Sequence, residues 1–212
     1  MYELLLDGTM QLNACRGASG GECRFALPFA PREGELLVEA AKRAEWPEFL
    51  LKKTGGRPHS HQTLKVAVSG CANGCSRPHI ADFALIRAET PQIRSEDCIS
   101  CGLCVEACPE GAVRIESGEA ATIDYDACLS CGRCERSCPA GAISPRTSGY
   151  RVLAGGRLGR NPKLARELPG IRSLDQSVEV FEDALKKIMS DYEQGVRHGV
   201  ILDCWNPAES AA

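Results

Sequence analysis

The stretches "CISCGLCVEACP" at residues 98–109 and "CLSCGRCERSCP" at residues 128–139 decide the fold of the middle of this chain. Each reads CxxCxxCxxxCP, and the second run repeats the first after 30 residues. Two-residue gaps let three thiolates surround one metal centre, and Gly102 and Gly132 let the backbone approach that centre closely. The proline after the last cysteine turns the chain away. The pattern predicts two metal centres with four thiolates each.

The doubled run resembles that of the bacterial two-cluster ferredoxins, in which the fourth cysteine of each run ligates the other cluster. The resemblance assigns one [4Fe–4S] cluster to Cys98, Cys101, Cys104 and Cys138. It assigns a second cluster to Cys128, Cys131, Cys134 and Cys108. The segments 112–116 and 121–125 alternate as short strands and complete the ferredoxin unit. Zinc also binds CxxC pairs, but the doubled triple-cysteine run followed by proline disfavours it.

Five of the thirteen cysteines remain: Cys15, Cys23, Cys71, Cys75 and Cys204. The first four form two short pairs, in "ACRGASGGEC" (14–23) and "SGCANGC" (69–75), and can supply a third [4Fe–4S] cluster. The alternative is that the second pair consists of packed thiols beside a turn. Its glycine-rich, polar surroundings are poor core. We expect the unpaired fifth cysteine to be a packed thiol.

Bulk composition excludes several classes of protein. A net charge of -3 without a long basic run argues against nucleic acid as a partner. The N-terminus lacks a positively charged leader, and no apolar run approaches the roughly 18 residues of a membrane span. Clustered cysteines without a secretion signal disfavour a secreted disulfide scaffold. These features predict a soluble, cytoplasmic protein with no membrane insertion.

Hydrophobic periodicity predicts an α+β fold. Helices are expected over 33–45 and, with a serine cap, over 177–196, and strands over 63–70 and 82–88. We expect one discontinuous domain, 1–90 and 146–212, interrupted by a ferredoxin insert at 91–145. Among the histidines, His59 and His61 are expected in solvated loops, His79 near the second cysteine pair and His198 at the surface.

The stretch "LKVAVSGCANGCSRPHIADFALI" (64–86) resembles the siroheme–[4Fe–4S] domain of sulfite and nitrite reductases, and so does "GYRVLAGGRLGRNPKLARELPG" (149–170). A dicluster ferredoxin between these elements is similar to the dissimilatory and anaerobic sulfite reductase subunits. The resemblance implies an oxidoreductase that passes electrons from an external low-potential donor through two ferredoxin clusters to a siroheme-coupled centre. There a small oxyanion such as sulfite or nitrite is reduced. In that family the second cysteine of the CxxxC pair is the axial bridge to siroheme, which corresponds to Cys75.

The resemblance also indicates where cations are needed, because siroheme carries many carboxylates and the substrate is an anion. Where the family has an arginine and two lysines, this chain has Gln11, Thr63 and Lys65, which makes Lys65 the candidate anion-binding catalytic residue. The candidate siroheme-binding cations are Arg77 and, at a glycine turn leading into an expected helix, Arg157, Arg160 and Lys163. An ordinary solvated helix start is the alternative for these residues.

Two departures from the family leave a second function open. The spacing between Cys15 and Cys23 is longer than usual, and because Cys15 lies close to the first residue, we expect the ferredoxin-like half domain that precedes this cysteine in the family to be absent. A second subunit or a homo-oligomer is therefore expected to complete the site. The alternative function is a non-catalytic electron-transfer subunit of a larger redox complex, with or without siroheme.

Overall fold

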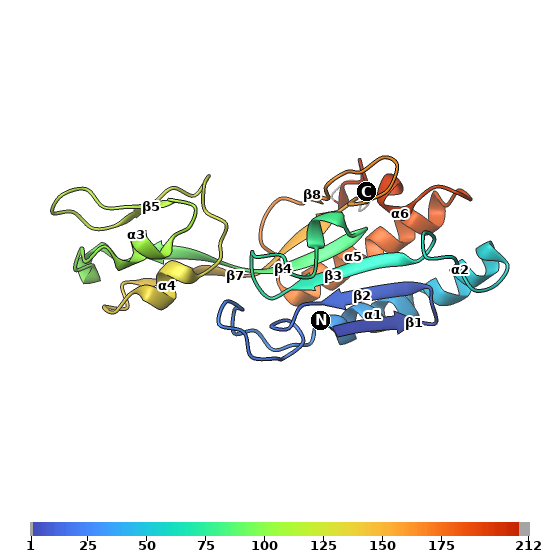
Figure 1. Ribbon diagram of the computed structural model, residues 1–212, viewed down its shortest axis with the longest axis horizontal. Helices are drawn as coiled ribbons and strands as arrows, with labels where there is room; N and C mark the ends of the chain where they lie inside the picture. The colour runs from blue at the N-terminus through green and yellow to red at the C-terminus, as the bar shows by residue number, and fades with distance from the viewer. Residues whose placement is uncertain (1, 208–212) are drawn as a thin grey trace.

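The computed structural model describes residues 2–207 and consists of a body and a long arm (Figure 1). The body is built on a six-stranded sheet with the strand order β1-β2-β3-β4-β7-β8. Its strands are β1 (Tyr2–Leu6), β2 (Met10–Ala14), β3 (Leu64–Ser69), β4 (Phe83–Ile93), β7 (Ile143–Ala154) and β8 (Arg166–Glu167). Its helices are α1 (Glu33–Arg43), α2 (Trp46–Thr54), α5 (Leu174–Ser190), α6 (His198–Ile201) and the 3-10 turn η1 (Pro78–Ile80).

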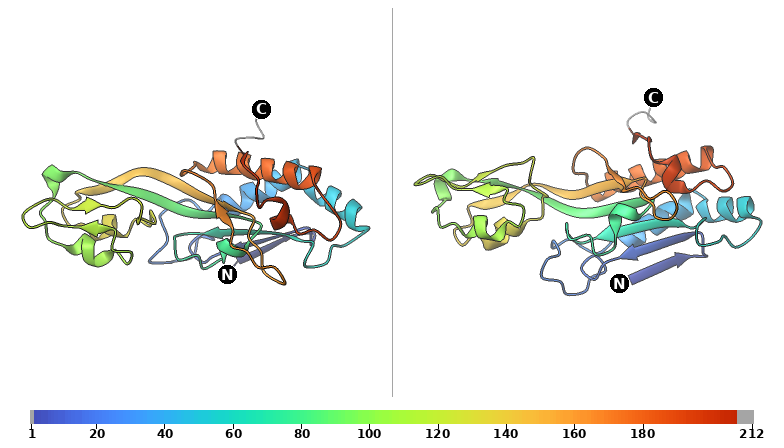
Figure 2. Two further views of the ribbon diagram at one scale, coloured as in Figure 1. Left: turned by 90° about the horizontal axis from the view of Figure 1, so that it is seen from above. Right: turned by 45° about the horizontal axis from the view of Figure 1, so that its top comes forward.

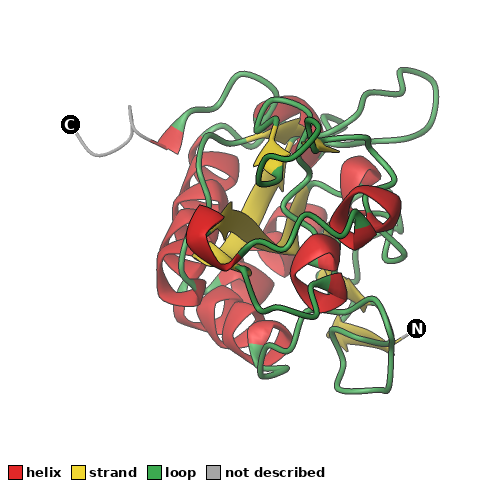
Figure 3. Ribbon diagram, turned by 90° about the vertical axis from the view of Figure 1, so that its left-hand side faces the viewer, coloured by secondary structure: helices red, strands yellow, loops and turns green. Residues whose placement is uncertain are grey.

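One face of the sheet is covered by the long helices α1, α2 and α5, which gather on one side of the strands when the molecule is seen along its long axis (Figure 3). Side chains alternate between the two faces of a strand. On β2 this alternation buries Met10 and Leu12 completely. These side chains join Trp46, Phe83 and Phe181 in the main hydrophobic core. The core therefore lies between the sheet and the helices.

The other face of the sheet is free of long helices, as the view from above shows (Figure 2). It carries the alternate residues of the same strands, among them Gln11 and Lys65. Since β2 and β3 are parallel and Gln11 pairs in register with Lys65, the two side chains project from neighbouring positions. This face is where polar groups of the body can meet a ligand.

The arm leaves the body as a direct continuation of two central strands. β4 and β7 pair as antiparallel strands from Phe83↔Ala154 to Ile93↔Ile143, with one irregularity between Thr90 and Pro91. Beyond them lie η2 (Ser95–Asp97), α3 (Leu103–Ala107), α4 (Arg133–Ser137) and the two-stranded sheet of β5 (Val113–Arg114) and β6 (Thr122–Ile123). The expected limits of the insert at 91 and 145 fall within these paired strands, so the arm is joined to the body without a loose linker.

The α+β class is confirmed, and the expected strands over 63–70 and 82–88 correspond to β3 and β4. The helix expected over 33–45 is α1. Pro47 lies in the first turn of α2, where proline is tolerated. Within residues 2–207, no helix has the length and apolar character to cross a membrane.

Some local predictions were wrong. The last long helix begins at Leu174, three residues early, because Ser173 and Gln176 form a capping box; the predicted start, Ser177, is buried inside it. The helix expected after the glycine turn at 155–163 is absent there, because that segment folds back through an Arg157↔Lys163 bridge into β8.

Two side chains also lie elsewhere than expected. His198 is buried rather than at the surface, and it contacts the Trp46 ring edge-on at 5.2 Å. Cys204 is exposed rather than packed. Each follows a poorly periodic stretch in which the sequence carries little signal for burial.

Candidate functional site

The eight cysteines of the arm gather around two separate small cavities. Cys98, Cys101, Cys104 and Cys138 line the first, which we call the distal set. Cys108, Cys128, Cys131 and Cys134 line the second, which we call the proximal set. In each set, three cysteines come from one run and the fourth from the other run. This grouping is the crossed arrangement that the resemblance to two-cluster ferredoxins implies.

The environment of these thiols suits a positively charged metal centre. Burial raises the pKa of Cys134 to about 12, and the neighbouring sulfurs of Cys128 and Cys131 contribute to the rise. Burial likewise raises the pKa of Cys104. Ligation requires thiolates, so a cationic centre has to offset this cost. Within residues 2–207, no three His, Cys, Asp or Glu side chains are close enough to hold one single metal ion. Cubane clusters separate their ligand sulfurs more widely than that.

Cys15, Cys23, Cys71 and Cys75 also come together, and we call them the body set. Burial raises the pKa of Cys71, and the sulfurs of the other three are close enough to raise it further. Cys15 and Cys71 are buried, while Cys23 and Cys75 are exposed. The backbone N–H of Gly70 donates to the Cys15 sulfur at 3.1 Å. The longer spacing between the first two cysteines is therefore compatible with one shared site.

A buried ion pair that the sequence did not reveal holds the first cysteine loop. Arg87 on β4 is 2% exposed, and its Nε lies 2.5 Å from Glu33 Oε1. Its guanidinium also donates to the carbonyls of Gly17 (3.3 Å), Ala18 (3.4 Å) and Leu27 (3.1 Å). These carbonyls flank Cys23 and follow Cys15. Arg87 thus fastens the loop of the body set to a central strand.

The proximal set lies against the body set. A cavity between them is lined by Cys71 and Phe25 from the body and by Leu129, Cys131 and Arg133 from the arm. The guanidinium carbon of Arg133 is 5.6 Å from the centre of the Phe25 ring.

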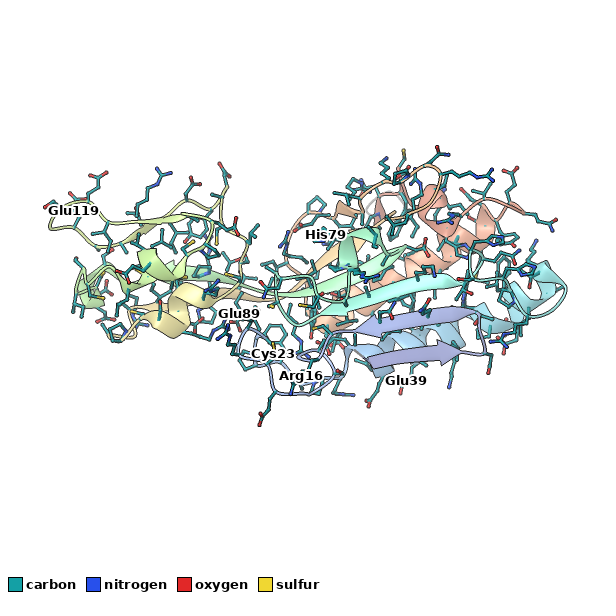
Figure 4. The ribbon with its side chains drawn as sticks, viewed as in Figure 1. Arg16, Cys23, Glu39, His79, Glu89 and Glu119 are labelled. Carbon is teal, nitrogen blue, oxygen red and sulfur yellow. The ribbon has the colours of Figure 1, made fainter. Side chains whose placement is uncertain are left out.

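Backbone contacts at Glu89, which lies at the base of the arm in Figure 4, hold this junction in place. The Glu89 N–H donates to the Ser130 carbonyl at 2.7 Å. Gly132 has a φ of +67°, which favours glycine, and a side-chain carbon added there would come within 2.8 Å of the end of the Leu27 side chain. The order from the end of the arm is therefore distal set, proximal set, body set.

An open cavity of about 400 Å³ occupies the helix-free face of the sheet next to the body set. Ser76 and Arg77, which follow Cys75 directly, form part of its wall. Gln11, Thr63 and Lys65 all line it, and Lys65 Nζ donates to Gln11 Oε1 at 3.2 Å. The three positions that the family resemblance singled out are thus brought together.

The predicted cations divide into two groups. Arg77 and Arg157 line the cavity, whereas Arg160 and Lys163 are not part of its wall. Arg157 and Lys163 both contact Asp203, at 3.1 and 2.9 Å.

Two further basic side chains line the cavity that the sequence analysis did not select, Arg197 and His61. His61 was expected in a solvated loop, and it is exposed at the cavity rim. Arg197 lies in an irregular segment with no motif, so no sequence pattern could have identified it.

Asp82 is the acidic side chain in the cavity wall, and its surroundings favour the neutral form. Its Oδ2 accepts a hydrogen bond from the Lys65 backbone N–H at 2.8 Å. Burial raises its pKa, although His198 and Lys65 oppose the rise. Lys65, Arg77, Arg157 and Arg197 line the same cavity, so basic side chains outnumber acidic ones in its wall. Its size and charge fit a polyanionic ligand.

Comparison with known proteins agrees with this layout. Residues 97–142 match the family model of the 4Fe-4S dicluster domain. The chain is 36% identical over 179 residues to the coenzyme F420-dependent sulfite reductase of Methanocaldococcus jannaschii, covering 84% of this chain and 25% of that protein. It is 33% identical over 60 residues to an anaerobic sulfite reductase subunit of Salmonella typhimurium, covering 27% of this chain and 18% of that protein. The chain thus spans a quarter or less of the length of these relatives.

The fold has a counterpart among solved structures. The crystal structure of dissimilatory sulfite reductase I superposes with a TM-score of 0.59 at 19% identity, covering 96% of this chain and 51% of that chain. At this identity the likeness concerns the fold. The fold likeness covers nearly all of the present chain, and the sequence likeness covers most of it. The chain is therefore similar in sequence to sulfite reductases, shares its fold with a dissimilatory one, and carries a 4Fe-4S dicluster domain.

Proposed function

We propose that this chain is the electron-carrying and tetrapyrrole-binding part of a sulfite reductase-type oxidoreductase that reduces a small oxyanion such as sulfite or nitrite. The distal, proximal and body sets would each hold one [4Fe–4S] cluster, and the cavity beside Cys75 would hold siroheme. The observation that carries the proposal is the continuous series of three four-cysteine sets ending at a cationic cavity. The insert at 91–145 would then be an electron-delivery domain within a domain formed by 1–90 and 146–212.

The bound groups would supply single-electron storage and transfer to the oxyanion. The cysteines would hold the clusters, and the junction at Phe25 keeps the proximal set close to Cys71. Arg77, Arg157 and Arg197 can neutralise the carboxylates of a tetrapyrrole, since charge-assisted hydrogen bonds are the strong ones. Lys65 is placed to bind a small anion in the same cavity.

Asp82 and Lys65 also bear on proton supply, because reduction of sulfite or nitrite consumes protons. The buried carboxyl of Asp82 retains its proton to a higher pH than an exposed one, since its pKa is raised by burial. A lysine and a carboxyl with a raised pKa at one cavity wall are suitable proton donors to a bound oxyanion.

A second function, electron transfer without catalysis, is favoured by one observation. Two of the three family positions in the cavity are the neutral Gln11 and Thr63, and the Thr63 hydroxyl donates to the Gly8 carbonyl at 2.9 Å rather than to the cavity. A catalytic role would then require a second subunit or another copy to add cations. Electron transfer without catalysis would not require those additional cations.

The decisive experiment is to measure iron, labile sulfide and tetrapyrrole in the anaerobically purified chain. The proposal predicts twelve irons in clusters and one siroheme per chain, from the ligand count. Cys71→Ser should remove the body cluster and leave eight cluster irons. Eight irons in both proteins would refute the body cluster. Full clusters without tetrapyrrole after reconstitution with siroheme would favour the electron-transfer function.

A further inference from the structure

The internal repeat of the arm places equivalent residues in unequal surroundings. Ile99 and Leu129 occupy the same position in the two cysteine runs, as do Leu103 and Arg133. In the proximal run, Leu129 and Arg133 form the junction with Phe25 and Cys71. In the distal run, Ile99 is 65% exposed, against 37% for Leu129, and Leu103 is 43% exposed. The surface that joins the proximal set to the next redox site thus has an uncovered counterpart beside the distal set.

The distal set is also the more accessible of the two. Cys101 is the exposed cysteine among the eight of the arm, all of which lie within the described residues. Ile99 lines the same small cavity as the four distal cysteines. A protein that covers Ile99 would therefore lie directly against the distal site.

Acidic residues lie on both sides of Ile99 and Leu103 along the chain. Glu96 and Asp97 precede Cys98, with Asp97 paired to Arg94 at 2.5 Å, and Glu106 lies on α3. Glu119, at the far end of the arm in Figure 4, lies beside the distal cysteine run, because the Ser100 hydroxyl donates to the Glu119 carbonyl at 2.6 Å. Acidic side chains outnumber basic ones in residues 91–145. Of the four arginines there, Arg94 is paired with Asp97, Arg114 lies 3.9 Å from Asp124, and Arg133 and Arg136 belong to the proximal run. A partner protein that binds the end of the arm therefore needs an apolar centre to cover Ile99 and Leu103, with basic side chains around it.

We infer that the end of the arm, which we call the port and define as Ile99, Leu103, Glu96, Glu106 and Glu119, is the docking surface for a basic one-electron donor protein. The inference rests on the proposed function and names the class of its electron donor. In each encounter the reduced donor loses one electron and the oxidised distal cluster gains one. No bond is made and no proton moves. In the proximal run, the equivalent residues contact the next redox site. This equivalence is the reason for inferring that the occupant of the port is a redox protein.

The test measures electron exchange between the full chain, with its clusters assembled, and a basic c-type cytochrome as the probe. The chain is first reduced with dithionite and freed of excess reductant. It then passes single electrons to ferric haem, which is followed by stopped-flow absorbance. The wild-type rate should fall steeply with added salt, because opposite charges steer the encounter. Glu96→Gln/Glu119→Gln should lower the low-salt rate about tenfold and flatten the salt dependence.

Neutral substitutions then separate the port from other surfaces. Ile99→Asn/Leu103→Asn should slow exchange about tenfold at every salt concentration, through loss of apolar contact at the docking centre. Leu164→Asn is the matched control, because Leu164 is 66% exposed but lies in the body. It should leave the rate unchanged. Leu129→Asn tests the groove beside Cys128, the competing entry point.

Cluster absorbance and the extent of reduction by dithionite are recorded for every variant. Port variants with normal clusters and an unchanged exchange rate would overturn the docking inference alone. A rate that falls only in the Leu129 variant would overturn it in favour of the groove. A wild-type chain that assembles no cluster in the arm would overturn the proposed function and the inference with it.

Discussion

Replacing Arg87 with methionine should unfasten the loop that carries Cys15 and Cys23. Arg87 and Glu33 form a bidentate pair, with N···O distances of 2.5 and 3.1 Å and both side chains 1% exposed. The Tyr150 hydroxyl donates to the same Glu33 carboxylate at 3.1 Å. The substitution leaves Glu33 charged and buried with only that hydroxyl, and it removes the donors to three loop carbonyls.

The magnitude follows from this burial. Removing one partner of a buried ion pair costs about 3–5 kcal/mol, because an uncompensated charge remains in the interior. With urea slopes of about 1–3 kcal/mol/M, the unfolding midpoint should fall by at least about 1 M. The matched control is Arg43→Met. Arg43 pairs with Glu182 at the surface, where the two side chains are 57% and 29% exposed, and its loss should cost no more than about 1 kcal/mol.

The assay combines urea unfolding, followed by the fluorescence of the two buried tryptophans, Trp46 and Trp205, with cluster-specific paramagnetic resonance. We expect Arg87→Met to lower the midpoint and to lose the body-set signal while the signals of the arm persist. An Arg87→Met midpoint no lower than that of Arg43→Met would refute the reasoning. So would an intact body-set signal in a protein whose stability has fallen as expected, because the loop would then not depend on Arg87.

Three further predictions concern the redox sites and the cavity. Cys75→Ser should abolish the body-set signal and siroheme binding but spare the arm, since the ligand sets share no residue; simultaneous loss of all paramagnetic signals in a folded protein would contradict this. Phe25→Ala should weaken the magnetic interaction between the reduced proximal and body clusters at unchanged iron content, because it removes the ring that faces Arg133; an unchanged interaction would argue against the junction. Burial raises the pKa of Asp82, so its contribution to stability is present below the unfolded value of about 3.9 and is lost as pH rises through the folded pKa. The stability gap between Asp82→Asn and the wild type should therefore shift in favour of the variant as pH rises toward neutrality, and parallel urea midpoints across that range would count against a raised pKa.

The sequence by itself determined the features that depend on short spacing. The two cysteine runs define their metal sites within a few residues, and the alternation of "LKVAVS" predicts β3 whatever lies beside it. The apolar spacing of 33–45 likewise predicted α1. The crossed grouping of Cys108 and Cys138 was also expected, because the doubled run resembles that of the two-cluster ferredoxins.

Only the tertiary structure decided which distant residues share a site. The parallel register of β2 with β3 puts Gln11 opposite Lys65, and no local pattern specifies that neighbour. Arg197 and Asp82 reach the same cavity from an irregular segment and from the start of β4. The unequal roles of Leu129 and Ile99 arise because the arm meets the body on one side only, so equivalent residues of a sequence repeat become a partly covered junction and an open surface.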